Sequence, residues 1–168
     1  MEISFFVVGD PVGQPRQRIT VRFGHAHNYT PQKIKRDGLW VPNPIVVWKD
    51  TVERYAMRHR PRRPLGGALR VDFIFYFPRP MNHFGTGRNL GLLKDSAPVF
   101  STTKPDRDNC DKAVLDVLTE MDFWHDDAQA ADGRIQKKYG PILLSSGRRA
   151  CGVLVRIRPC HVPAKTLF

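Results

Sequence analysis

The chain is organised around residues 104–129, which read KPDRDNCDKAVLDVLTEMDFWHDDAQ. Apolar residues recur in the first half of this stretch at spacings of three and four, which predicts the buried face of a helix. They are Cys110, Ala113, Val114, Val117, Leu118 and Met121. Pro105 favours an extended residue before it, so the helix is not expected to begin earlier. Asp108 or Asn109 is then expected at its N-cap.

A lysine accompanies two carboxylates at the start of this helix. Asp106 and Asp108 are expected to project together from its first turn. Lys112 lies four residues after Asp108 and therefore on the same helix face. Three charged groups are thus expected to converge there.

A second acidic pair follows the helix. After a turn at Asp122, residues 123–127 are expected to be extended and to run back ~14 Å along a helix of ~20 Å. Asp126 and Asp127 would then return toward the start of the helix within one subunit. Since neighbouring strand residues point to opposite faces, only one of them, or a bulged pair, is expected to reach the site directly.

Carboxylates gathered at one place repel one another unless a cation neutralises them. Mg²⁺ prefers such hard oxygen ligands and keeps waters that can contact substrate phosphates, and a nearby lysine supplies positive charge for a phosphate oxygen. A structural explanation is also open, because acidic residues commonly cap helices and Asp-Asp is common in turns. For Asp106 or Asp108 taken singly the cap is favoured, and for the whole set in so basic a chain a metal site is favoured.

The stretch and the residues after it carry a series of spaced motifs. These are Lys104-Pro105-Asp106-x-Asp108-Asn109, then Lys112, Asp116 and Leu118, then Trp124-x-Asp126-Asp127-x-Gln129, and Lys137-x-Tyr139. In order and spacing over residues 100–140, the series resembles the RusA family of Holliday-junction resolvases.

The resemblance implies a homodimeric endonuclease, often prophage-encoded, that depends on Mg²⁺, with Mn²⁺ as an alternative, and resolves four-way DNA junctions by two symmetric nicks. It implies a RusA-like domain over residues 1–160 and a tail over 161–168. It also implies roles for individual side chains: Asp106, Asp108 and Asp127 as essential metal-binding acids, Asp126 as a further acid of the cluster, and Lys112 as an essential phosphate contact.

Length and charge agree with one basic domain. The 168 residues suit a single hydrophobic core, and a net charge of +11 favours a polyanion such as nucleic acid as the partner. An anionic membrane is the competing partner, but no stretch approaches the ~20 apolar residues of a spanning helix, and residues 1–8 lack the basic lead of a signal peptide. Cys110, Cys151 and Cys160 show no paired spacing, so they are expected to be reduced thiols of a cytoplasmic protein in a bacterium or phage-infected cell.

Basic residues outside the helix are candidate contacts to the DNA backbone. A proline-punctuated segment carries Arg16, Arg18 and Arg22, and a long segment without periodicity carries Arg88. Lys104 and Lys112 complete the candidate set. Such cations contribute affinity without reading sequence, and the other interpretation of the two segments is a solvated loop.

The whole chain predicts an α+β domain with a mixed sheet of about four or five strands and two main helices. Strands are expected at residues 2–8, 68–77, 128–139 and 151–157. Residues 68–77 are apolar on both faces and are therefore expected to form a central strand. The other helix is expected to begin at Asn43-Pro44, with a buried stripe of Ile45, Trp48, Val52, Tyr55 and Ala56.

Residues 78–103 show no period. A loop of this length is usually functional or disordered. It is expected either to be mobile and to order over a DNA junction, with Phe84 as a base-stacking wedge, or to be a disordered tether.

Two other functions remain open from the sequence. One is a nucleic-acid-binding protein without catalysis, whose acids cap the helix. The other is a nucleotide-sugar transferase, because Asp-x-Asp is also a metal and diphosphate motif. Small size and high charge disfavour the transferase, and the second acidic pair disfavours the pure binder.

Overall fold

The computed structural model describes residues 2–160 except 16–17, 23–24 and 144–148, and for residues 18, 22, 26–28, 142–143 and 149 it describes the backbone alone. The expected tail at 161–168 and the side chains of Arg16, Arg18 and Arg22 therefore lie outside the described residues.

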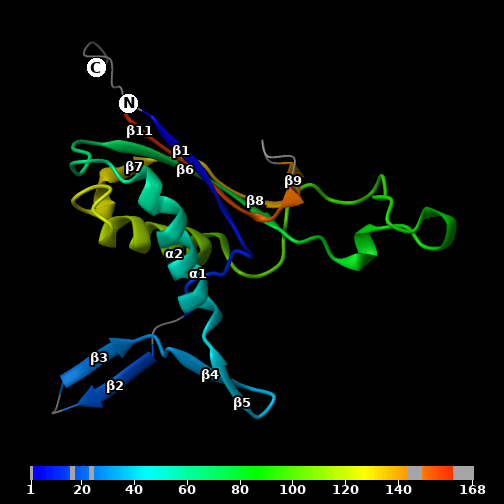
Figure 1. Cartoon of the computed structure of the whole chain (residues 1–168), viewed down its shortest axis with the longest axis horizontal. Helices are drawn as coiled ribbons and strands as arrows, with labels where there is room; N and C mark the ends of the chain where they lie inside the picture. The colour runs from blue at the N-terminus through cyan, green and yellow to red at the C-terminus, as the bar shows by residue number, and fades with distance from the viewer. Residues whose placement is uncertain (1, 16–17, 23–24, 144–148, 161–168) are drawn as a thin grey trace.

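A five-stranded mixed sheet forms the body of the protein (Figure 1). The strands are β1 (Ile3–Val8), β11 (Gly152–Pro159), β6 (Leu69–Phe77), and β7 (Ala130–Asp132) followed by β8 (Ile135–Tyr139) along the other edge of β6. β1, β11 and β6 pair antiparallel, whereas β7 and β8 run parallel to β6. The predicted α+β class, the mixed sheet and the central place of strand 68–77 are confirmed.

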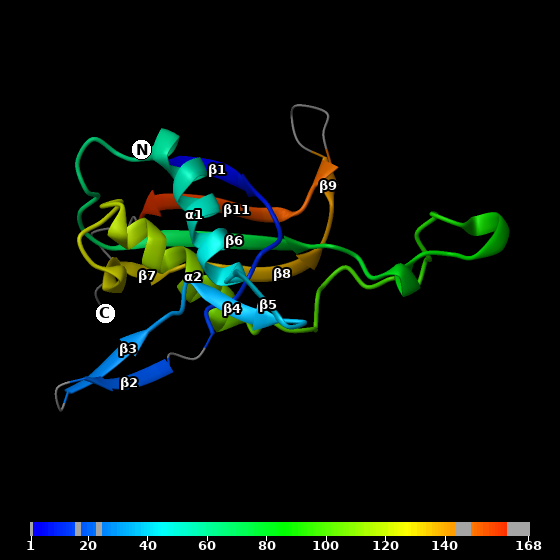
Figure 2. The same ribbon diagram turned by 60° about the horizontal axis from the view of Figure 1, so that its bottom comes forward.

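Two helices, α1 (Pro44–Ala56) and α2 (Arg107–Glu120), pack against the sheet and complete the core (Figure 2). Every second residue of β6 is buried, from Leu69 to Phe77, while the residues between them are half-buried. The predicted buried faces of both helices are confirmed except at Tyr55, which is 37% exposed.

A glycine divides the strand that was expected over residues 128–139. A Cβ on Gly133 would stand 1.9 Å from the carbonyl oxygen of Val71. The chain can approach β6 this closely only without a side chain, and the approach separates β7 from β8.

The basic segment after β1 forms two hairpins rather than a loop. They are β2 (Arg18–Arg22) with β3 (His25–Tyr29), and β4 (Lys33–Arg36) with β5 (Leu39–Pro42), and both project from the body (Figure 1). Asp37 and Gly38 form the second turn with φ of 51° and 83°. Positive φ at both central residues is the geometry of a two-residue hairpin turn, and Asp-Gly is the residue pair that favours it.

Residues 78–103, called the arm below, also project from the body (Figure 2). Bridges between Phe84 and Leu93 and between Gly85 and Leu90 fold the arm back on itself. It rejoins the sheet where the Ser101 amide donates to the Lys137 carbonyl oxygen (3.0 Å). Phe84 is half-buried within the arm, so it is not presented as the exposed wedge that the sequence suggested.

Short elements complete the fold: the 3₁₀ turns η1 (Met57–His59), η2 (Met81–His83), η3 (Gly87–Asn89) and η4 (Asp127–Gln129), and the strand pair β9 (Ile142–Leu143) and β10 (Arg149–Ala150). Neither helix in the part of the chain that the structure describes has the length and apolar run needed to cross a membrane.

We expect Asn43→Ala to lower the free energy of unfolding by about 1–2 kcal/mol. Asn43 is 8% exposed; its side chain accepts from the Ile45 amide as the N-cap of α1 and donates to the Pro31 carbonyl oxygen (2.8 Å). Urea unfolding measures the change. The control Asn82→Ala, at an exposed position in the arm, should stay within about 0.5 kcal/mol of wild type; an equally small effect at Asn43 would contradict its anchoring role.

Candidate active site at the start of helix α2

Helix α2 begins earlier than the sequence indicated. Asp106 occupies the N-cap, and the Cys110 amide already donates to the Asp106 carbonyl oxygen (3.1 Å). The prediction of Asp108 or Asn109 at the N-cap is therefore wrong, and Asp108 lies in the first turn instead.

The carboxylates of Asp106 and Asp108 have no structural partner among the described residues. Asp106 occupies the N-cap, yet its side chain accepts no hydrogen bond from the first-turn amides. Both residues are exposed, and neither carboxylate takes part in an ion pair or side-chain hydrogen bond within the described part of the chain. The capping explanation does not account for these oxygens, which remain available to a cation.

The segment between β1 and β2 is fixed against these acids. A Cβ on Gly13 would stand 2.6 Å from the Pro105 Cβ, and the Gln14 amide donates to the Asn109 carbonyl oxygen (2.8 Å). An open hollow of about 650 Å³ lies here. Its lining residues are Pro11, Val12, Gly13, Gln14, Pro15, Lys104, Pro105, Asp106 and Asn109.

Gln14 is a candidate that sequence reasoning missed. Gln14 is 8% exposed and lines the hollow beside Asp106, and its Oε1 has no hydrogen-bond partner within the described part of the chain. An unpaired buried oxygen is costly unless a ligand satisfies it. Beside Asp106 on the hollow, it adds an oxygen of the kind that suits Mg²⁺ and its bound waters.

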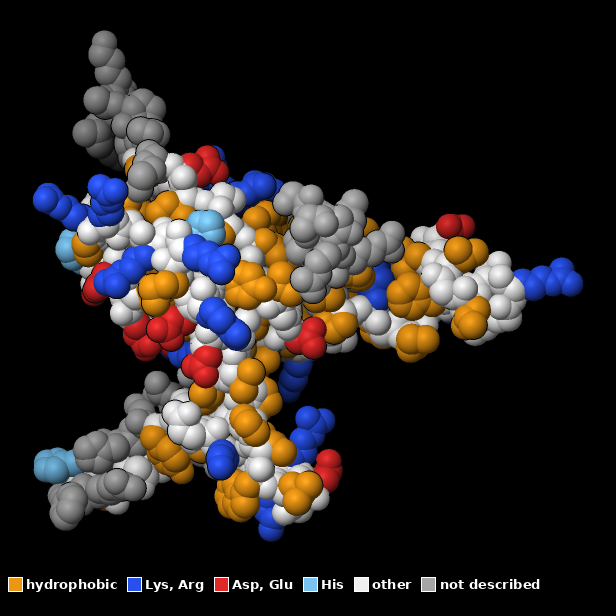
Figure 3. Space-filling model, in the orientation of Figure 1, with side chains coloured by type: hydrophobic (Ala, Val, Ile, Leu, Met, Phe, Trp, Pro, Cys, Tyr) orange, Lys and Arg blue, Asp and Glu red, His pale blue; other side chains and the backbone are white. Residues whose placement is uncertain are grey.

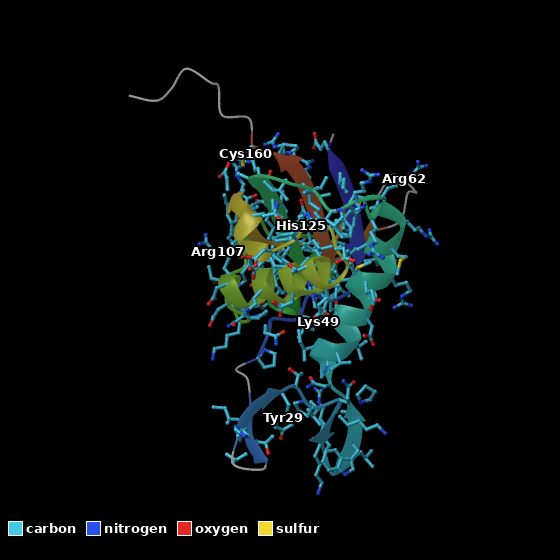
Figure 4. The ribbon with its side chains drawn as sticks, turned by 90° about the vertical axis from the view of Figure 1, so that its left-hand side faces the viewer. Tyr29, Lys49, Arg62, Arg107, His125 and Cys160 are labelled. Atoms are coloured by element: carbon cyan, nitrogen blue, oxygen red, sulfur yellow. The ribbon has the colours of Figure 1, made fainter. Side chains whose placement is uncertain are left out.

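Lys112 is held by a different acid from the one expected. Its Nζ lies 3.6 Å from Asp116, which also accepts a 2.9 Å hydrogen bond from Lys49 of α1. Figure 4 labels Lys49 at this contact between the helices. Asp116 thus places two lysines side by side, and no bond joins Lys112 to Asp108 among the described residues.

A second cation, which sequence reasoning quoted in a motif but assigned no role, lies at the start of α2. The ammonium group of Lys137 on β8 donates to the Thr103 carbonyl oxygen. Burial raises the pKa of the Cys110 thiol to about 11, and Lys137 opposes that shift. Cys110, Cys151 and Cys160 are all unpaired, as predicted.

The predicted return of residues 123–127 as a strand is wrong. Phe123 and Trp124 are fully buried. The Phe123 carbonyl oxygen accepts from the Leu65 amide (2.9 Å), and the Trp124 indole donates to the Thr119 hydroxyl (2.7 Å). Burial of these two aromatic side chains holds the segment at the end of α2 and stops it from running back.

The chain after Trp124 then turns into η4, with Asp126 as its N-cap. The Asp126 carboxylate accepts from the Ala128 amide (2.8 Å), and the Gln129 side chain accepts from the amides of His125 (2.8 Å) and Asp126 (3.2 Å). Asp126 is therefore a capping residue. Asp127 is exposed, and its carboxylate has no partner among the described residues.

The second acidic pair lies in the turn that follows α2. The helix has 14 residues and is about 20 Å long, and Gln129 ties η4 to the carbonyl oxygens of Leu65 and Gly67, each at 3.0 Å. Within the described ranges, no group of three or more His, Cys, Asp or Glu side chains is placed to hold a metal ion. One chain alone does not gather the predicted acidic cluster.

The candidate DNA contacts that can be placed fall on two parts of the molecule. Lys104 and Lys112 are exposed at and just inside the start of α2, and Arg88 is exposed on η3 of the arm. Arg18 and Arg22 are the first and last residues of β2, and the structure describes their backbone alone.

Comparisons with known proteins agree with the motifs. A family model described as "Endodeoxyribonuclease RusA" matches residues 9–142. A relative from Bacillus subtilis (strain 168), named "Uncharacterized protein YqaN", is 32% identical over 142 residues, which cover 82% of this chain and 87% of that protein.

Asp111, another acid that sequence reasoning did not single out, makes the stability of the folded protein depend on pH. It lines a cavity of about 200 Å³ between α2 and the strands β6 and β7. Burial raises its pKa from 3.8 to about 6; Arg107 opposes the shift and Asp108 adds to it. Because the folded-state pKa is raised, the folded protein loses stability as pH rises from about 4 to about 6, where the unfolded chain ionises first.

Asp111→Asn, which mimics the protonated acid, should therefore stabilise the protein by about 1 kcal/mol at pH 8, allowing for partial exposure, and have little effect at pH 4. Urea unfolding at the two pH values measures the difference. Asp50→Asn, at an exposed position on α1, is the matched control. An equal effect of Asp111→Asn at both pH values would contradict the proposed burial penalty.

Proposed function

Because this chain belongs to the RusA family of endodeoxyribonucleases, we propose that it resolves Holliday junctions by paired, symmetric nicks. The observation that carries the proposal is a pair of carboxylates, Asp106 and Asp108, that have no partner among the described residues and stand at the start of α2 in a chain of net charge +11. A strongly basic protein does not need exposed acids for DNA binding, whereas phosphodiester hydrolysis has a use for them.

Mg²⁺, with Mn²⁺ as the alternative, is the proposed cofactor. Asp106, Asp108 and Asp127 would hold it, and the Gln14 Oε1, which has no hydrogen-bond partner among the described residues, supports an oxygen-rich site beside Asp106. Such a cation supplies an activated water and neutralises charge on the scissile phosphate.

The chain's own cations would position the DNA. Lys112, which Asp116 orients, would contact the reacting phosphate and stabilise charge that develops there. Lys104 lies on the hollow beside Asp106 and would hold a neighbouring phosphate. Arg18 and Arg22 on β2, Arg16 shortly before them in sequence, and Arg88 on the arm would extend the contacts along the DNA backbone.

We propose a homodimer in which Asp127 acts at the start of α2 of the other copy. Mg²⁺ ligands lie about 2.1 Å from the metal, and the described residues of one chain contain no group of three acids placed to hold an ion. A two-fold dimer also suits a junction that must be nicked twice. The arm offers apolar side chains for contact between copies, since Met81, Leu90 and Leu92 are exposed.

A non-catalytic nucleic-acid-binding protein is the second candidate. The separation of the acids within one chain favours it. In that protein Asp127 would be only the first residue of a surface turn, where asparagine serves nearly as well as aspartate.

Asp127→Asn separates the two candidates. Loss of a charged ligand should lower junction cleavage by more than about 100-fold, the upper range for residues that merely support a ligand. Binding in EDTA should be equal or tighter, because a repulsive carboxylate is removed from the DNA path. Gel-based cleavage and binding assays on a labelled four-way junction measure both quantities, and Asp95→Asn in the arm is the control. Near wild-type cleavage by a folded Asp127→Asn protein would contradict the proposed catalytic role of Asp127.

Mixing inactive variants tests the shared site. In a mixed dimer of Asp106→Asn and Asp127→Asn, one site carries both changes and the other is intact, so about a quarter of all sites should recover and nick one strand. A mixture of Asp106→Asn with Asp108→Asn, prepared by the same refolding, should recover nothing. Absence of recovery in the first mixture, with exchange of subunits verified, would place all three acids within one chain.

A further inference from the structure

Trp40 is an exposed tryptophan in a molecule whose other tryptophans are core residues. The chain has three tryptophans; Trp48 and Trp124 are 3% and 1% exposed, whereas Trp40 on β5 is 69% exposed. Exposing an indole of this size to water is unfavourable, since its large apolar surface stays unburied. None of the roles assigned above uses it.

The strand register places a cation directly opposite the indole. Lys35 pairs with Trp40, and Arg36 pairs with Leu39 beside the two-residue turn. In such a hairpin the pair next to the turn is hydrogen-bonded, so Lys35 and Trp40 form a non-hydrogen-bonded pair, whose side chains stand closest together. Pro42, which has no amide hydrogen, lies opposite Lys33 in the next non-hydrogen-bonded pair.

One face of the β4–β5 hairpin therefore carries Lys33, Lys35 and Trp40 together. Successive residues of a strand point to opposite faces, so Ile34 and Val41, both half-buried, lie on the other face. Figure 3 shows cationic and apolar side chains exposed together on this hairpin. Only one acid, Asp37, offsets the three cations of the hairpin, Lys33, Lys35 and Arg36.

The hairpin is fixed at its base to the body. The Asn43 amide donates to the Gln32 carbonyl oxygen (2.9 Å), and the Asn43 side chain donates to Pro31 (2.8 Å) while capping α1. Trp40 thus stands on a short ribbon that leaves directly from the start of a core helix. Figure 4 shows the hairpins, with Tyr29 labelled, standing apart from the helices and sheet.

We propose that Trp40 stacks on a base left unpaired at the crossover of a DNA junction, with Lys33 and Lys35 contacting the adjoining phosphates; the inference rests on the proposed junction-cleaving function. Every base presents a π-face, and an aromatic side chain flanked by cations is the usual platform for unpaired nucleotides. Charge decides the class of partner. An apolar protein surface would have to desolvate these cations, whereas a nucleic acid pairs with them.

Tryptophan fluorescence gives a direct test, because Trp40 is the exposed emitter. In EDTA, a four-way junction should quench the emission and a linear duplex of the same sequence should not, since a duplex offers no unpaired base. Trp40→Phe should lose the quenching while retaining junction binding. Trp40→Ala should bind the junction about tenfold more weakly, and duplex binding should change less than twofold.

Leu39→Ala is the matched control, because Leu39 is equally exposed, at 70%, but lies on the opposite face of the same hairpin. It should leave junction affinity within twofold of wild type. The inference is overturned if the junction binds without quenching the emission, or if Leu39→Ala weakens binding as much as Trp40→Ala. It is also overturned if Trp40→Ala converts a dimer to a monomer in sedimentation, because Trp40 would then be a contact between copies. Cleavage by the wild-type protein is scored separately, so the stacking role can fail while the proposed nuclease stands.

Discussion

The close approach of Gly13 to Pro105 holds the functional end of the protein together. Only a residue without Cβ fits there, and the adjoining bond from the Gln14 amide to Asn109 fastens the chain after β1 to the first turn of α2. The basic hairpins therefore begin close to Asp106 and Asp108, whose carboxylates have no partner among the described residues. The arm rejoins the same region through Ser101 and Lys137.

Local patterns predicted the parts of the fold in which burial follows a strict period. The stripes of α1 and α2 and the alternation of β6 are set by which side chains leave water, and both periods can be read directly from the order of residues. The predicted N-cap of α2, Asp108 or Asn109, was wrong by two or three residues, because a helix end depends on which carbonyl accepts the first amide, and here the Asp106 carbonyl does so.

Contacts between distant segments could not be predicted in this way. The path after α2 is set by burial of Phe123 and Trp124. Phe123 is also hydrogen-bonded to Leu65, which is far away in sequence, and Trp124 to Thr119 at the end of α2. The hairpin β4–β5 is a different case, because Asp37-Gly38 is a strong local turn signal that the basic composition of the segment concealed.

The candidate site shows the same division. Its residue types were readable from the sequence, whereas their roles required the structure. Asp126 caps η4, Asp116 orients Lys112, and the Asp106 carboxylate at a helix terminus has no partner among the described residues. The two acidic pairs thus differ in their contacts. Asp106 and Asp108 have no partner among the described residues, whereas in the second pair Asp126 caps η4. In the proposed dimer, the second copy of the chain would supply Asp127 to this site.

The most direct measurement is strand-resolved cleavage by the wild-type protein of a labelled four-way junction and of a linear duplex with the same sequence, each with Mg²⁺ and with EDTA. The account predicts paired nicks at symmetry-related positions of the junction, in Mg²⁺ only, with the duplex left intact. Tight binding of the junction without cutting in either Mg²⁺ or Mn²⁺, or equal cutting of junction and duplex, would contradict it.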